Sequence, residues 1–269
     1  MADPYAELLV DLTAEHAALD AVAADLEADR WDTPTPSPGW SVRDQIGHLH
    51  HFDGTALLSA TDPAAFVAER DTMMATLLDP AAAPDALDRH TLAFARGATP
   101  EELLAAWRQD RGALVEALAT LDPKHRLEWY GPPMSAMSFA TARLMETWAH
   151  GQDLVDAVGA DRPPTDRLRH IAHLGVRTRE FTYVLRGREA PAAPVRVELV
   201  APSGAVWEWG PDDAADRVTG PALDFCLVVT QRRHPADTGL AIAGPVAEDW
   251  MAIAQAFAGL PTEGPPPRS

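Results

Sequence analysis

Hydrophobic positions recur with a helical period through most of the first 186 residues. The stripe of the first predicted helix, over residues 4–28, comprises Leu8, Leu9, Leu12, Leu19, Val22 and Leu26. Three prolines and Gly39 then exclude helix and central strand between residues 31 and 40. Ser41 and Asp44 have the spacing of a capping box, which predicts a second helix from about residue 42 to about residue 60.

Further helical segments follow, separated by proline and glycine. Shorter helices are expected over residues 63–78 and 84–96, broken by Pro80 and Pro84. Thr99, followed by a proline and two glutamates, predicts the start of a helix that reaches about residue 121. After a loop over residues 123–133, the remaining predicted helices cover about 138–158 and about 165–185 and end near Gly159 and Gly187.

The pattern changes after Arg188, where a proline- and alanine-rich linker leads into a segment in which hydrophobic and polar residues alternate. Val195–Val200 has a period of two, as expected for a half-buried strand. The later predicted elements are strands at 206–209, 217–219 and 240–243, helices at 221–231 and 245–257, and a frayed tail from Pro261. We therefore predict a mainly α protein with a helical domain over residues 1–186 and a small α+β domain over residues 194–260.

Composition narrows the function classes. The 269 residues carry a net charge of −18, which argues against nucleic acid or an anionic membrane as a partner. No apolar run approaches the roughly 20 residues of a membrane span, and the N-terminus lacks the features of a signal peptide. We expect a cytoplasmic monomer or homodimer that acts on a small molecule.

The chain has one cysteine, Cys226, within an apolar run. It cannot form an internal disulfide or a cysteine-based zinc site, and a buried, inert thiol is the expected state. If the chemistry requires a thiol, that thiol must come from outside the chain.

Glu146 and His150 are the strongest candidates for chemistry. They lie four positions apart in a mainly apolar predicted helix, so their side chains leave the same face one turn apart. Such a pair is also common on helix surfaces. Burial of one face of this helix would, however, require a partner for both groups, such as a metal ion.

The second helix carries His48, His50 and His51 among apolar residues. His48 and His51 share a face, whereas His50 points away from it and is expected to face solvent or a domain contact. Two histidines and a carboxylate leave the fourth position of zinc open, and iron, nickel or manganese would accept the same ligands. Asp153 could orient a ligand or be a solvated helix charge.

Two segments resemble a known family. Trp31 and the stretch from Thr33 to Asp44, followed by Gly47-His48-Leu49, resemble the N-terminal signature of the mycothiol-dependent maleylpyruvate isomerase family, in an actinobacterial metal-binding branch. Glu146-Thr147-Trp148-Ala149-His150-Gly151-Gln152-Asp153 is similar to its second signature. The resemblance implies a DinB-like four-helix bundle and the metal ligands His48, Glu146 and His150.

The C-terminal stretch is similar to the family's small second domain. The resemblance implies a low-molecular-weight thiol, activated at the metal, that adds to a double bond and leaves again or displaces a leaving group. It also implies that Arg232 contacts an anionic substrate, next to Gln231, where the family usually has glycine. Gln45 and Arg143 are expected to support the bound cofactor, and Asp153 is expected, with Arg232, to support catalysis.

Three hypotheses follow from these features. The first is a metal-dependent isomerase or thiol transferase. The second keeps the metal without the thiol, as a hydrolase, lyase or tailoring enzyme of secondary metabolism. The third is a non-catalytic binding protein with a vestigial site.

Overall fold

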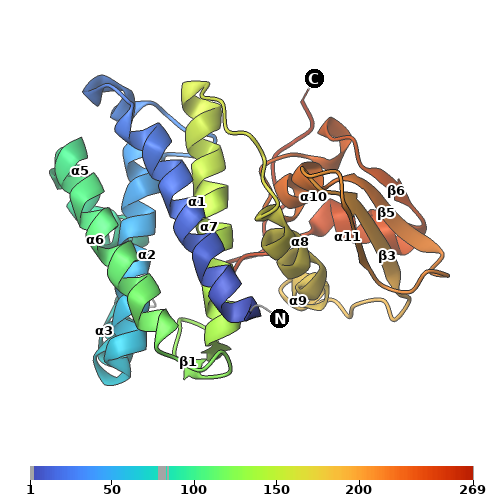
Figure 1. Cartoon of the computed structure of the whole chain (residues 1–269), viewed down its shortest axis with the longest axis horizontal. Helices are drawn as coiled ribbons and strands as arrows, with labels where there is room; N and C mark the ends of the chain where they lie inside the picture. The colour runs from blue at the N-terminus through green and yellow to red at the C-terminus, as the bar shows by residue number, and fades with distance from the viewer. Residues whose placement is uncertain (1–2, 78–82, 84, 269) are drawn as a thin grey trace. The chain divides into compact units, whose positions relative to one another are not determined.

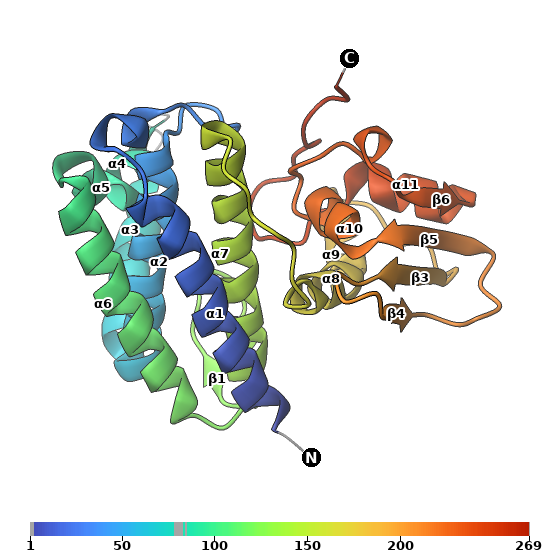
Figure 2. The same ribbon diagram turned by 45° about the horizontal axis from the view of Figure 1, so that its top comes forward.

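The structure is a computed structural model that describes residues 3–77, 83 and 85–268. The chain divides into two compact units, residues 1–161 and residues 162–269. In the first unit, four long helices run alongside one another (Figures 1 and 2): α1 (Pro4–Ala24), α2 (Val42–Thr61), α6 (Pro100–Ala119) and α7 (Ala136–Val158). This is the predicted DinB-like bundle.

The bundle closes as a ring of neighbours, in which α1 packs on α6 and α7, and α2 packs on the same two helices. The core between them is dominated by fully buried side chains such as Leu49, Leu103 and Trp107. Burial of one such side chain contributes about 1.5–3 kcal/mol. The direct packing of α2 on α7 matters most for function, because these two helices carry the candidate ligands.

Local signals set the ends of the helices. The Ser41 hydroxyl accepts the backbone N–H of Asp44, and the Asp44 carboxylate accepts the backbone N–H of Ser41, so the predicted capping box is confirmed. Thr99 and Glu102 form the same motif at the start of α6. Gly159, at φ +71°, ends α7 in the left-handed conformation that favours glycine.

Several segments of the first unit differ from the prediction. The first helix ends at Ala24, and Ala28–Asp32 forms a separate 3-10 turn, η1. The segment predicted as one helix over 84–96 is two short ones, α4 (Ala86–Thr91) and α5 (Ala93–Gly97). The helix expected at 63–78 is α3 (Pro63–Leu77), while residue 78 and the breaks at Pro80 and Pro84 lie outside the described residues.

A hairpin occupies the segment that was expected to be a loop. Its strands, β1 (Arg126–Leu127) and β2 (Met134–Ser135), pair antiparallel and lead directly into α7. Two residues per strand are too few to show a period-two pattern. The hairpin presents the loop over residues 128–133.

The second unit contains a four-stranded sheet with the order β4-β3-β5-β6. The predicted hairpin of β3 (Val195–Val200) and β4 (Val206–Trp209) is confirmed, and β5 (Asp216–Pro221) pairs parallel to β3. The remaining strand, β6 (Ala241–Ala243), pairs antiparallel to β5. The helices α10 (Ala222–Val229) and α11 (Pro245–Ile253) pack on this sheet (Figure 2), and the 3-10 turn η2 (Pro235–Asp237) precedes β6.

Two helical boundaries in the second unit differ from the prediction. The helix expected at 165–185 is divided at Thr178 into α8 (Leu168–Arg177) and α9 (Arg179–Val184). Because α8 packs on α10, the compact units place residues 162–186 with the C-terminal part of the chain. The last helix ends at Ile253, because Ala254 turns extended and the Ala256 N–H donates to the carbonyl of Val229.

None of the helices in the described parts of the chain combines the length and the apolar character that a membrane span requires.

Candidate metal centre

His48 on α2 and Glu146 and His150 on α7 converge in the first unit. One ligand atom from each residue lies within 4.8 Å of the other two. The Oε2 atom of Glu146 is 3.6 Å from Nε2 of His48 and 3.1 Å from Nε2 of His150. Among the described residues this is the one group of three or more histidine, cysteine and acidic side chains with such spacing.

These separations fit a single cation. Ligand atoms about 2.1 Å from a tetrahedral zinc ion lie roughly 3.4 Å from one another. The side chains of His48, Glu146 and His150 are 18%, 23% and 11% exposed, so the cluster is partly open to solvent. Three ligands with an open side are the arrangement typical of catalytic rather than structural zinc sites.

The electrostatics favour the protonation states that ligands need. Burial, together with the nearby His150, lowers the pKa of His48 to about 3, so its imidazole is neutral at physiological pH. Although burial raises the pKa of Glu146, the adjacent His150 and His48 rings hold it well below its usual range. A neutral imidazole and an ionised carboxylate are the forms that bind a metal.

Gln45 sets the tautomer of His150. Its Oε1 atom lies 2.6 Å from Nδ1 of His150, and an amide oxygen can only accept, so Nδ1 carries the proton. The Nε2 lone pair of His150 is therefore directed toward the cluster. The amide nitrogen of Gln45 in turn donates to Thr35 Oγ1 at 2.8 Å.

Arg143 was expected to support a cofactor, but the structure places it in a buried ion pair. Its Nε atom donates to Asp53 Oδ1 at 2.9 Å, and Trp107 Nε1 donates to Asp53 Oδ2 at 2.9 Å. Arg143 and Asp53 are both buried. This network ties α2, α6 and α7 together in the bundle core.

Asp153 lies one turn beyond His150 and is also buried. Its Oδ2 atom accepts a hydrogen bond from Ser37 Oγ at 3.1 Å. Ser37 belongs to the proline-rich segment between η1 and α2, so Asp153 holds this segment against α7.

Arg232 lies in the second unit, just after α10, where its Nη1 atom donates to the carbonyl of Thr230. The preceding residue, Gln231, has φ +58° and is the non-glycine residue at positive φ in the described chain. Its side-chain amide donates to the carbonyls of Ala254 and Thr262 at 3.1 Å each. The polar side chain thus fastens the C-terminal tail at a position where glycine would be unstrained.

The other histidines of α2 do not join the cluster. His50 was expected to face solvent or a domain contact, but it faces α6 of the same bundle, with Nδ1 3.2 Å from Asp110 Oδ2. His51 packs on His90, with ring centroids 5.5 Å apart. Cys226 is buried, as expected, and burial raises the pKa of its thiol.

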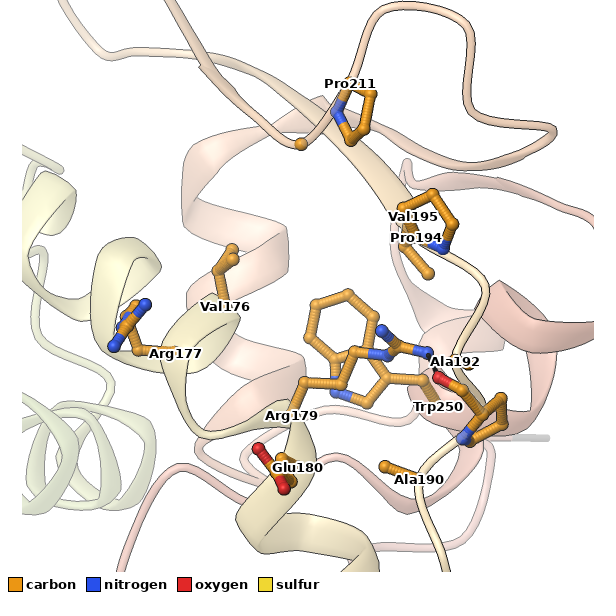
Figure 3. A pocket seen from close by; sticks show the side chains of 12 residues that line it. Val176, Arg177, Arg179, Glu180, Ala190, Ala192, Pro194, Val195, Pro211 and Trp250 are labelled. Carbon is orange, nitrogen blue, oxygen red and sulfur yellow. Dashed lines mark hydrogen bonds between the residues drawn. The ribbon is translucent and has the colours of Figure 1, made fainter.

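The second unit has a cavity of about 480 Å³. Figure 3 shows Trp250 from α11 and Arg179 from α9 among the side chains around it. Arg179 Nη2 donates to the carbonyls of Pro191 and Ala193 and so fixes the linker that forms one wall. All the residues that line this cavity belong to the second unit.

Asp53, Thr35 and Trp40 were not among the residues expected at the site. Asp53 follows His48 by five positions, and a lone carboxylate in an apolar stretch of helix was the available signal. Trp40 lies in the proline-rich segment, and its ring centroid is 5.2 Å from that of His48 and 5.9 Å from that of His150. This contact depends on how the loop folds back.

In comparisons with protein families, residues 12–155 match the family described as "Mycothiol maleylpyruvate isomerase N-terminal domain". Residues 191–241 match the family described as "Wyosine base formation". Two proteins from two strains of Mycobacterium tuberculosis, both described as uncharacterized, are 50% identical over 264 residues, which is 98% of this chain and 100% of each relative.

Two solved structures share the fold. The crystal structure of the mycothiol-dependent maleylpyruvate isomerase has a TM-score of 0.57 and 16% identity, with 89% of this chain and 93% of that chain covered. A histidine-to-alanine mutant of that enzyme has a TM-score of 0.55 and 16% identity, covering 86% and 90%. At this identity, the likeness concerns the fold.

Proposed function

The chain belongs to the mycothiol maleylpyruvate isomerase family, and on that premise we propose that it is a metal-dependent enzyme that acts on a small organic molecule with the help of a low-molecular-weight thiol. The reaction class is isomerisation or thiol transfer. His48, Glu146 and His150 are the proposed ligands, with zinc as the first choice of metal and iron, nickel or manganese as alternatives.

One observation carries this proposal. Three ligand atoms from two neighbouring helices lie within 4.8 Å of one another, and their side chains remain partly exposed. A purely structural site would be closed by a fourth protein ligand. The open side leaves room for an external group.

When bound there, a divalent cation with a vacant position lowers the pKa of a thiol, so that a thiolate exists near neutral pH. The protein's own residues prepare this position. Gln45 keeps the proton of His150 on Nδ1, and Asp153 holds the loop that carries Trp40. The chain's own thiol is unsuited to the task, because Cys226 is buried in the other unit.

Arg232 remains the proposed contact for an anionic group of the substrate. Asp153 is proposed to act through the loop that it holds rather than on the substrate directly, because its carboxylate accepts the Ser37 hydroxyl. Arg143 is proposed to position α7 through Asp53.

The first test is the metal itself. Elemental analysis of the purified protein and titration with Zn²⁺ should give one bound ion per chain. The variant His150→Ala should lose that ion and keep its fold by circular dichroism. His125→Ala, at an exposed histidine of the same unit, is the matched control and should bind one ion. Full occupancy in His150→Ala would overturn the ligand assignment.

The second test separates thiol-dependent from thiol-independent chemistry. The zinc-loaded protein is assayed on a panel of activated alkenes and esters with and without added mycothiol. Turnover that requires the thiol supports the proposal, whereas turnover without it would favour a hydrolase or lyase. A protein that retains no metal would instead support a binding function.

A further inference from the structure

A row of aromatic side chains begins at the candidate ligands. The ring of Trp40 lies 5.2 Å from the ring of His48 and 5.9 Å from that of His150, almost parallel to the latter at 22°. Trp40 is fixed in this position because its Nε1 atom donates to Asp88 Oδ2 on α4 at 3.0 Å. The Trp40 indole is therefore held in a fixed position beside the cluster.

The row continues on the other side of His48. Phe52, one turn later on α2, lies 4.5 Å from the His48 ring. Tyr130 and Trp129, from the loop between β1 and β2, lie 5.7 Å and 6.2 Å from Phe52. Residues far apart in the sequence thus extend one aromatic surface away from the ligands.

The loop that carries Trp129 and Tyr130 is anchored at its start. Ser59 Oγ donates to the carbonyl of Glu128 at 2.6 Å, and Arg70 Nη1 donates to the carbonyl of Trp129 at 3.2 Å. These contacts come from α2 and α3, and they fix the loop against the helix that bears His48. The rings of Trp129 and Tyr130 are therefore on a loop whose backbone is held in position.

Exposure distinguishes this row from ordinary core packing. Phe66 and Phe139, which also contact Trp129, are each 1% exposed. In contrast, the four members of the row, Trp40, Phe52, Trp129 and Tyr130, are all half-buried. Partly exposed aromatic rings that lead away from a candidate metal centre provide faces and edges on which a planar group can pack.

We propose that the molecule processed at this centre carries a planar aromatic group, which packs against Phe52 and the Trp129–Tyr130 loop while its sulfur or reacting carbon lies at the His48–Glu146–His150 cluster. This inference rests on the proposed function, since it assigns a substrate class to the same site. The aromatic row selects the aryl group, and the ligands provide the chemistry.

The test uses two thiols that differ in aromaticity but little in size, phenylmethanethiol and cyclohexylmethanethiol. The protein is loaded with Co²⁺ in place of zinc, and each thiol is titrated while the sulfur-to-cobalt charge-transfer band is followed. We expect phenylmethanethiol to bind about three- to tenfold more tightly, the range that aromatic pairs add to simple burial.

Two variants locate the source of this preference. Phe52→Leu and Trp129→Leu keep an apolar side chain but remove the aromatic face, and each should bring the affinity ratio close to one. Phe94→Leu changes a 49% exposed phenylalanine that packs on His50, outside the row, and should keep the full ratio. Circular dichroism and Co²⁺ affinity confirm that each variant is folded and loaded.

The outcomes separate the two proposals. Failure to bind Co²⁺, or absence of the band with both thiols, would overturn the metal–thiol function and this inference with it. A normal band with equal affinity for the two thiols would overturn the aromatic assignment alone. So would a preference that survives in both Phe52→Leu and Trp129→Leu.

Discussion

The Nδ1 atom of His150 donates to Oε1 of Gln45 across the α2–α7 interface at 2.6 Å. This contact joins the helix that bears His48 to the helix that bears the other two candidate ligands. The hydrogen-bond partner of a metal-binding histidine fixes the tautomer and orientation of its ring and thereby contributes to metal affinity.

Replacement of Gln45 by leucine should therefore weaken Zn²⁺ binding about 10- to 100-fold, because the His150 ring loses the acceptor that fixes its tautomer. Competition with a chromophoric chelator measures this change. Gln45→Glu keeps an acceptor and should bind at least as tightly as the parent. Gln152→Leu, which removes a contact with Asp156 along α7, is the control. Unchanged affinity in Gln45→Leu would show that the amide has no orienting role.

The Asp53–Arg143 pair should be important for stability. Asp53→Ala leaves a buried guanidinium without its carboxylate and Trp107 Nε1 without its acceptor, so the free energy of unfolding should fall by about 3–5 kcal/mol. Urea denaturation measures this loss. Asp32→Ala removes a mostly exposed partner of Arg43 and should cost about 0–1 kcal/mol. Similar losses in the two variants would contradict the buried-pair interpretation.

Buried His16 should make stability depend on pH. Burial lowers the pKa of His16 from 6.5 to about 4, so the folded protein disfavours the protonated imidazole. The neutral His16 imidazole therefore contributes about 3 kcal/mol to the free energy of unfolding. This contribution is complete above pH 6.5 and declines as the pH falls from 6.5 toward 4. The difference in unfolding free energy between the parent and His16→Gln should therefore shrink over this interval. A difference independent of pH would exclude His16 as the source.

Gln231 offers a test of backbone strain against side-chain contacts. Gln231→Ala loses the side-chain hydrogen bonds with Ala254 and Thr262 and keeps an unfavourable φ of +58°, whereas Gln231→Gly loses the same bonds but relieves the strain. The free energy of unfolding of Gln231→Ala should therefore be about 1 kcal/mol lower than that of Gln231→Gly. Thermal unfolding gives the order, and limited proteolysis reports release of the tail in both variants. The reverse order would mean that the strain is absent.

The sequence predicts the helices well where the signals are local. Ser41 and Asp44 mark the start of α2, and Gly159 marks the end of α7, because caps and left-handed turns depend on neighbouring residues. The hairpin around Trp129 is missed, since the loop between its two-residue strands is held by long-range contacts from Ser59 and Arg70. Such contacts leave no local pattern.

In the candidate site, too, local spacing predicts some features, whereas others depend on how the helices pack. The spacing of Glu146 and His150 predicts their shared face, but whether His48 or His51 joins them depends on the rotation of α2 within the bundle. The partner of Arg143 could not be predicted, because Asp53 lies on another helix and meets it only after the four helices pack. The resemblance of the two segments to a family supplied the choice of His48.

The candidate ligands come from α2 and α7, which are separated in the sequence by the helices α3 to α6 and a hairpin. An unfolded chain therefore cannot present them together, and any cation that binds them selects the folded state. At a free concentration one hundred times its dissociation constant, such a cation would add about 2.7 kcal/mol to the unfolding free energy. Metal supply in the cell would then govern the lifetime of the protein against proteases as well as its activity.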